Sequence, residues 1–119
     1  MVKEKNKISK LELNRKELLV LLLSDDELIE GSYSELLVKC GRSGCHCEKK
    51  PIHLIARLGI REDGKVKNKV VRVADRDEVK RLTDRYREHK QALRQLEHIN
   101  QVEREILKKL IKRKNRGYV

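Results

Sequence analysis

Apolar residues recur at helical spacing in the last third of the chain. Residues 75–115 contain neither glycine nor proline, and their apolar side chains follow at intervals of three and four residues. This period places the side chains on one face of a long α-helix. They fit the a and d positions of a heptad, with His89, Asn100 and Glu103 as polar interruptions. The a and d residues are Val79, Leu82, Tyr86, Leu93, Leu96, Leu107 and Leu110. A second, adjacent stripe consists of Ile99, Val102 and Ile106.

A helix of this length is too long for a small domain to cover. Its outer end must lie in solvent, bend, or pair with another helix. We therefore predict a homodimer through residues 75–115, and Asn100 at an a position favours a two-stranded pairing.

The N-terminal part of the chain also predicts a helix. Ser9 and Glu12 have the spacing of a capping box, and the stretch to Leu23 is rich in Leu and Glu without Gly or Pro. Residues 1–8 are polar and are expected to be a flexible tail. Residues 18–23 are apolar on every side, which predicts burial in the fold or against a partner.

Strand signals occupy the middle of the chain. A second capping box at residues 24–27 predicts a short helix, and residues 33–39, 53–60 and 67–74 predict strands. Asp63-Gly64 between the last two predicts a β-hairpin. The expected fold is α+β in one domain. It comprises a tail (1–8), a helix with a cysteine knuckle and hairpin (9–74), a long basic helix (75–115) and a second tail (116–119).

All three cysteines of the chain, Cys40, Cys45 and Cys47, lie within eight residues beside two glycines. Thiolates so close together can chelate Zn²⁺, which prefers four tetrahedral ligands. We predict a structural zinc with His53 as the fourth ligand, because His53 opens the next strand. The alternatives for the fourth position are His46, Glu48 and a ligand from a second chain. Free thiols and a redox thiol are the alternatives to metal.

Composition argues against an enzyme with a large cleft. The chain has 119 residues, 38% of them hydrophobic, and its aromatic residues are three tyrosines. We find no P-loop, G-x-S-x-G or H-E-x-x-H motif, and we expect no enzymatic activity. The longest apolar run has six residues, far fewer than the roughly 20 of a membrane span. A cytoplasmic protein without membrane contact is therefore expected.

The net charge of +11 favours a polyanionic partner. Residues 1–31 carry a net charge of −1, whereas residues 32–74 and 75–119 each carry +6. The candidate nucleic-acid contacts are Arg42, Lys49, Lys50, Lys67, Lys69, Arg72, Lys108, Lys109, Lys112, Arg113, Lys114 and Arg116. Lys39, Arg57 and Lys65 extend the same predicted surface. A solvated basic surface is the simpler explanation of these charges.

The order of motifs in residues 25–110 resembles a family of small prokaryotic proteins, domain of unknown function 6788, often encoded beside transposase genes. The resemblance rests on Gly31, on C-G-R-S-G-C-H-C at residues 40–47, and on Pro51. In that family a histidine tends to precede the proline, whereas here His53 follows it. The resemblance implies a link to mobile elements and supplies no activity.

These observations predict a non-enzymatic nucleic-acid-binding accessory protein. The scarcity of aromatic residues disfavours base stacking, so duplex binding is expected. The link to mobile elements that the resemblance implies favours DNA, and RNA stays the alternative. The alternative is a protein-interaction module. In that case the long helix and the apolar residues 18–23 dock on a transposase-like partner, and nucleic acid is not bound directly.

Overall fold

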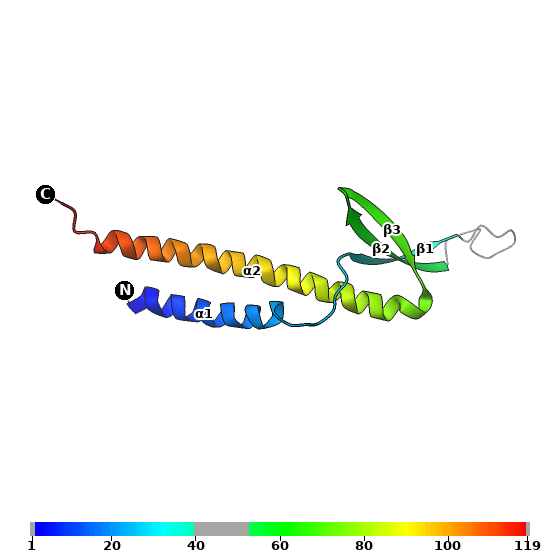
Figure 1. Cartoon of the computed structure of the whole chain (residues 1–119), viewed down its shortest axis with the longest axis horizontal. Helices are drawn as coiled ribbons and strands as arrows, with labels where there is room; N and C mark the ends of the chain where they lie inside the picture. The colour runs from blue at the N-terminus through cyan, green and yellow to red at the C-terminus, as the bar shows by residue number, and fades with distance from the viewer. Residues whose placement is uncertain (1, 40–52, 119) are drawn as a thin grey trace. The chain divides into compact units, whose positions relative to one another are not determined.

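The computed structural model describes residues 2–39 and 53–118. In chain order, the elements are helix α1 (Val2–Leu22), strands β1 (Ser32–Val38), β2 (His53–Glu62) and β3 (Lys65–Val71), the 3-10 helix η2 (Val73–Asp75) and helix α2 (Arg76–Lys114) (Figure 1). The predicted α+β fold, with an N-terminal helix, an antiparallel sheet and a long C-terminal helix, is confirmed. The predicted cysteine knuckle lies outside the described residues.

The chain forms two compact units. The first, here called the helical hairpin, comprises Met1–Asp26 and Glu88–Val119. The second, here called the sheet unit, comprises Glu27–Arg87. Helix α2 therefore contributes its first turns to the sheet unit and the rest of its length to the helical hairpin.

In the helical hairpin, α1 and α2 run antiparallel (Figure 1). Glu4 near the start of α1 pairs with Arg113 near the end of α2, and Arg15 pairs with Glu103 in the middle of each helix. The buried residues of α2 in this unit are Ala92, Ile99 and Ile106. They recur every seven residues, which is the repeat of helices packed side by side at a small angle.

The buried face of α2 differs from the predicted heptad seam. Leu93 and Leu107, assigned to a and d positions, are each 49% exposed. Ile99 and Ile106, from the adjacent stripe, are 6% and 8% exposed. An α-helix can turn only one of two adjacent stripes fully toward a single neighbour. The position of α1 decides which stripe is buried.

The expected N-terminal tail is wrong. Residues 2–8 are helical, because Ile8 is half-buried and Glu4 pairs with Arg113 of α2. The apolar residues 18–23 are not fully buried within the chain, since Val20 and Leu23 are 68% and 77% exposed, and their burial against a partner stays a prediction. One neighbouring helix covers only one side of α1, and α1 has no fully buried residue.

The sheet is antiparallel, with the strand order β1-β2-β3. The predicted hairpin turn at Asp63-Gly64 is present, and both residues have positive φ, 52° and 78°. Positive φ at both central residues defines the type I′ turn, whose twist matches that of the flanking strands. Ala56 and Val71 are paired across β2 and β3, and both are buried. Leu82 and Thr83 are the buried residues of α2 in this unit.

The segment before β1 forms no helix, although residues 24–27 have the spacing of a capping box. Its backbone groups bond to α2 instead. The amide of Ile29 donates to the carbonyl of Leu82 (3.2 Å), and the guanidinium of Arg85 donates to the carbonyl of Glu27 (2.6 Å). These long-range hydrogen bonds take the place of helical ones at residues 27–29, so the local capping signal is overridden.

Gly31 marks a close approach between this segment and β2. A Cβ at this position would lie 2.9 Å from the carbonyl oxygen of Gly59 and 2.8 Å from a methyl group of Leu58. A side chain larger than hydrogen would therefore push the segment away from β2. The φ of Gly31 is not positive, so the close approach rather than a left-handed conformation disfavours a side chain here.

Candidate nucleic-acid interface

The β2–β3 hairpin extends beyond the three-stranded part of the sheet. Strand β1 pairs with β2 from Val38↔His53 to Ser32↔Gly59, whereas β3 pairs with β2 as far as Glu62↔Lys65. Residues 60–62 and 65–67 therefore pair with each other alone and form a two-stranded ribbon. All residues from 61 to 70 are exposed.

Lysines dominate one face of this ribbon. Lys65 and Lys67 lie in the ribbon, and Lys69 lies just beyond it, paired with Leu58 in the three-stranded part of the sheet. The three lysines alternate along β3, so their side chains share a face. The opposite face carries Arg61 and its register partner Val66. The ammonium of Lys67 lies 3.2 Å from the carboxylate of Glu62, but both side chains are largely exposed. Such a surface pair contributes little to stability and leaves the lysine available to other anions.

The register separates the predicted basic residues of the sheet unit. Arg57 pairs with Ser34 and Val70 and so lies on the face opposite to Lys67 and Lys69. Arg72 follows the end of β3 and precedes η2. The predicted contacts Arg42, Lys49 and Lys50 lie outside the described residues.

The end of α2 carries the second predicted basic cluster. Arg113 donates a hydrogen bond to the carboxylate of Glu4, so this guanidinium helps to close the helical hairpin. The backbone amide of Glu4 and the Arg113 guanidinium lower the pKa of this carboxyl to about 2. Lys108 lies 3.6 Å from Glu105. The remaining cations are exposed, and their side chains take part in no hydrogen bond or ion pair in the described chain: Lys109, Lys112, Lys114 and Arg116.

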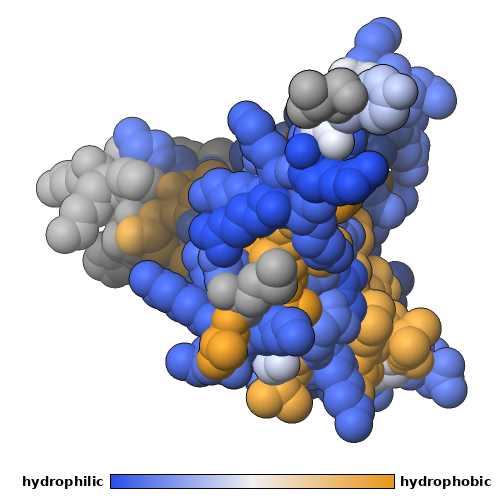
Figure 2. Space-filling view, turned by 90° about the vertical axis from the view of Figure 1, so that its left-hand side faces the viewer, coloured by the Kyte–Doolittle hydropathy of each residue, from blue (hydrophilic) through white to orange (hydrophobic). Residues whose placement is uncertain are grey.

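The surface of this end is hydrophilic with apolar interruptions. Figure 2 looks onto the end that carries both termini, where hydrophilic side chains surround smaller apolar patches. Cations in the last turn of α2 are also favourable to the helix itself, because the C-terminus of a helix carries partial negative charge. The basic end therefore has a structural role besides any contact with a polyanion.

The predicted metal ligands are only partly described. Cys40, Cys45 and Cys47 lie outside the described residues. His53 is exposed and opens β2, directly opposite Val38 at the end of β1. It thus lies at the end of the sheet from which residues 39–52 depart. Within residues 2–39 and 53–118, no group of three His, Cys, Asp or Glu side chains is arranged to hold a metal ion.

A charged cluster inside the helical hairpin is the feature that sequence reasoning missed. Arg15 donates hydrogen bonds to Glu12 (3.1 Å) and to Glu103 on α2 (2.8 Å). The Glu103 side chain is only 12% exposed. Burial, together with the nearby Glu12 carboxyl, raises the pKa of Glu103 above its usual value. Glu103 was visible as a polar interruption of the heptad, but nothing in the sequence indicated Arg15 as its partner.

We expect the variant Glu103→Gln to change the pH dependence of stability. Because the pKa of Glu103 is raised in the folded state, folding favours its protonated form. The contribution of Glu103 to the free energy of unfolding is therefore fully present below its unfolded pKa of about 4.3. It is lost as the pH rises through the pKa of Glu103 in the folded state. The melting temperature of the wild type relative to Glu103→Gln should fall as the pH rises from about 4 to about 7.

Thermal unfolding of both proteins across this pH range measures the effect. Glu105→Gln is the matched control, because Glu105 lies on the same helix with a largely exposed side chain. Parallel curves for wild type and Glu103→Gln would contradict the prediction.

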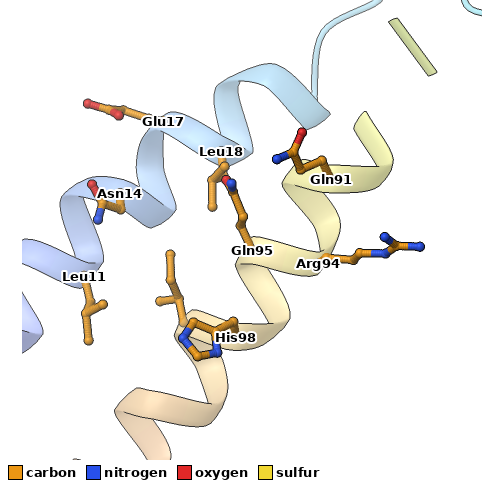
Figure 3. Close-up of a pocket in the computed structure, with 9 residues that line it drawn as sticks. Leu11, Asn14, Glu17, Leu18, Gln91, Arg94, Gln95 and His98 are labelled. Atoms are coloured by element: carbon orange, nitrogen blue, oxygen red, sulfur yellow. The ribbon is translucent and has the colours of Figure 1, made fainter. Parts of the chain in front are cut away.

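A groove between the two helices contains none of the predicted site residues. Its volume is about 620 Å³, and it is lined by Leu11, Asn14, Glu17, Leu18, Gln91, Arg94, Gln95, His98 and Ile99. Figure 3 shows Leu18 and Gln95 extending into the space between the helices, whereas the ends of Glu17 and Arg94 point away from it. The charged ends of Glu17 and Arg94 therefore do not converge in the groove.

Comparison with known proteins finds no matching family model, no matching curated protein and no matching solved structure. The resemblance to domain of unknown function 6788 therefore stays a prediction. Among the described residues, no helix combines the length and the apolar character that crossing a membrane requires.

Proposed function

We propose that the protein binds duplex nucleic acid, DNA in particular, through the β2–β3 ribbon. The observation that carries this proposal is the outer part of the β2–β3 hairpin, which is exposed from residue 61 to residue 70 and bears Lys65, Lys67 and Lys69 on one face. No covalent step is required, because binding itself is the proposed activity.

The dimensions of duplex DNA suit such an element. The major groove of B-DNA admits a two-stranded β-ribbon, and lysines on its face can contact phosphates at the rim of the groove. Side chains two residues apart in a strand are separated by about 7 Å, so three lysines follow the backbone over about 14 Å. The contacts are to phosphates, which gives affinity without strong sequence preference.

Single-stranded nucleic acid is a less suitable ligand. Sequence-tolerant binding of single strands depends on aromatic side chains on which bases stack. Strands β2 and β3 contain no Phe, Tyr or Trp. Tyr33 on β1 is half-buried, and its hydroxyl donates a hydrogen bond to Glu35 (2.6 Å).

The proposal is tested by duplex DNA binding of the triple variant Lys65→Thr, Lys67→Thr and Lys69→Thr. Threonine keeps a β-branched side chain in the strand and removes the charge. The logarithm of the binding constant falls with the logarithm of the salt concentration, and each phosphate contact adds about 0.9 to the steepness of this line. The triple variant should therefore have a slope that is smaller in magnitude by roughly 2–3. Fluorescence anisotropy with a labelled 20-base-pair duplex, at several salt concentrations, measures it.

The control carries the same charge change at another place. This control variant removes three exposed lysines of α1, through Lys7→Ala, Lys10→Ala and Lys16→Ala. Its salt dependence of duplex binding should stay close to that of the wild type. Lysines on an edge strand also prevent pairing with another sheet. The proposal is contradicted if both triple variants bind duplex DNA equally well, or if the wild type binds no duplex at low salt. The lysines of β3 would then serve only to prevent pairing with another sheet.

The second candidate function is a protein-interaction module, and the half-exposed leucines of α2 favour it. Leu93 and Leu107 are apolar and 49% exposed. Leu96 is half-buried in the helical hairpin, so changing it would disturb the hairpin as well as a partner. Leu93 is therefore the more discriminating position for a partner such as a transposase-like protein.

A structural zinc at Cys40, Cys45, Cys47 and His53 belongs to the same proposal. It would brace the end of the sheet where Val38 and His53 are paired. Imidazole and thiolates are ligands that suit Zn²⁺. Zinc content per chain, with a triple Cys→Ser variant as control, decides this prediction.

A further inference from the structure

A second stripe on α2 lies outside the contact with α1. Leu93 and Leu107 are each 49% exposed, Ile111 is 66% exposed, and Asn100 is also exposed. Asn100 lies seven residues from each leucine, so the three share one side of the helix. With the residues between them they form what we call the outer stripe: Leu93, Glu97, Asn100, Arg104, Leu107 and Ile111.

The outer stripe is distinct from the face that α1 covers. The buried residues Ala92, Ile99 and Ile106 each precede a member of the outer stripe by one residue. One residue corresponds to about 100° around an α-helix. A helix in a four-helix bundle contacts two neighbours on two faces at about this angle. In the helical hairpin, α1 occupies one of these faces. A shallow groove of about 290 Å³ lies where the two faces meet, because Arg15 of α1 lines it together with Arg104 and Leu107 of the outer stripe.

The chemistry of the outer stripe is self-complementary. If a second copy of α2 lies antiparallel and is centred on Asn100, residues whose numbers sum to about 200 face each other. Leu93 then meets Leu107 of the second copy, and Asn100 meets its own counterpart. Glu97 meets Arg104 of the second copy, and two-fold symmetry makes this ion pair twice. A parallel arrangement would place Glu97 against Glu97 and Arg104 against Arg104.

The polar members of the stripe have no competing partners in the described chain. The side chains of Glu97, Asn100 and Arg104 take part in no hydrogen bond or ion pair among residues 2–39 and 53–118. Neighbouring charges on α2 behave differently, since Glu103 pairs with Arg15 and Glu105 pairs with Lys108. Charge complementarity therefore indicates a second copy of the chain as the occupant.

We propose that two chains associate through the outer stripes of their α2 helices, antiparallel and centred on Asn100. The two helical hairpins then form a four-helix assembly. The apolar contacts supply the affinity. The Glu97–Arg104 pairs and the Asn100 pair select the antiparallel register. This association does not depend on nucleic acid binding.

Charge reversal tests the register. Sedimentation velocity of the full chain, at concentrations up to about 200 µM, should show a dimer. Glu97→Arg and Arg104→Glu, made singly, each place like charges opposite each other twice in the dimer. Each should raise the dissociation constant about tenfold or more. The double variant Glu97→Arg with Arg104→Glu restores opposite charges and should recover the wild-type constant.

The control is Glu105→Arg, the same substitution on another side of the helix, which should leave the dissociation constant within about threefold of the wild-type value. Far-ultraviolet circular dichroism verifies that each variant keeps its helices. A monomeric wild type over the whole concentration range would overturn the proposal. So would single reversals that do not weaken the dimer, or a double variant that is no stronger than the singles.

Discussion

Replacing Ile99 with alanine is expected to lower the free energy of unfolding by about 2–4 kcal/mol. Ile99 is 6% exposed and lies on the face of α2 that contacts α1. The helical hairpin has few buried residues, and α1 contributes none of them. Loss of three carbons from the Ile99 side chain removes apolar contact with α1. Among the described residues, the helical hairpin has no third layer that could fill the resulting space. Chemical denaturation followed by circular dichroism measures the change.

A surface leucine provides the comparison for Ile99→Ala. Leu13 on α1 is 64% exposed, and Leu13→Ala removes the same number of carbons. Its effect should stay within about 0.5 kcal/mol, as for most surface substitutions. Equal losses for the two variants would show that α1 does not cover Ile99 in solution.

Enlarging Ala56 to leucine is expected to destabilise the sheet unit by about 1–3 kcal/mol. Ala56 is fully buried at the centre of β2, where it is paired with Glu35 on β1 and with Val71 on β3. Three additional carbons have no space there without displacing a neighbouring strand or the helix. Amide hydrogen exchange should show weaker protection of β1, β2 and β3, with protection of the helical hairpin largely kept.

Ala74→Leu is the control for the sheet, since Ala74 lies in η2 and is exposed. The free energy of unfolding of this variant should stay within about 0.5 kcal/mol of the wild-type value. If Ala56→Leu left both stability and sheet protection unchanged, the tight centre of the sheet described above would be wrong.

Local signals predicted those elements whose cause is local. The Asp63-Gly64 turn was predictable because it depends on two residues that tolerate positive φ. The long helix from Arg76 to Lys114 was predictable because nothing in that stretch interrupts it. The capping box at residues 24–27 failed because hydrogen bonds from Ile29 and Arg85, to residues distant in the chain, replaced those of a helix.

For the candidate interface, the sequence supplied the charges but not their arrangement. It indicated Lys67, Lys69 and Arg57 as members of one basic surface, yet the strand register puts Arg57 on the other face. It indicated Arg113 as a phosphate contact, whereas the hairpin pairs this side chain with Glu4. Neither a register nor a pairing between residues about 110 positions apart is encoded in local composition.

The sequence by itself determined the types of element, their order and the two basic regions, because helix period, turn residues and net charge are properties of short stretches. Only the tertiary structure decided which of two apolar stripes on α2 is buried. Both stripes suit a neighbouring helix equally well in sequence, and α1 can cover only one. The choice of Ile99 and Ile106 left Leu93, Asn100 and Leu107 facing outward. It also placed Glu103 beside Arg15, where burial raises the pKa of its carboxyl.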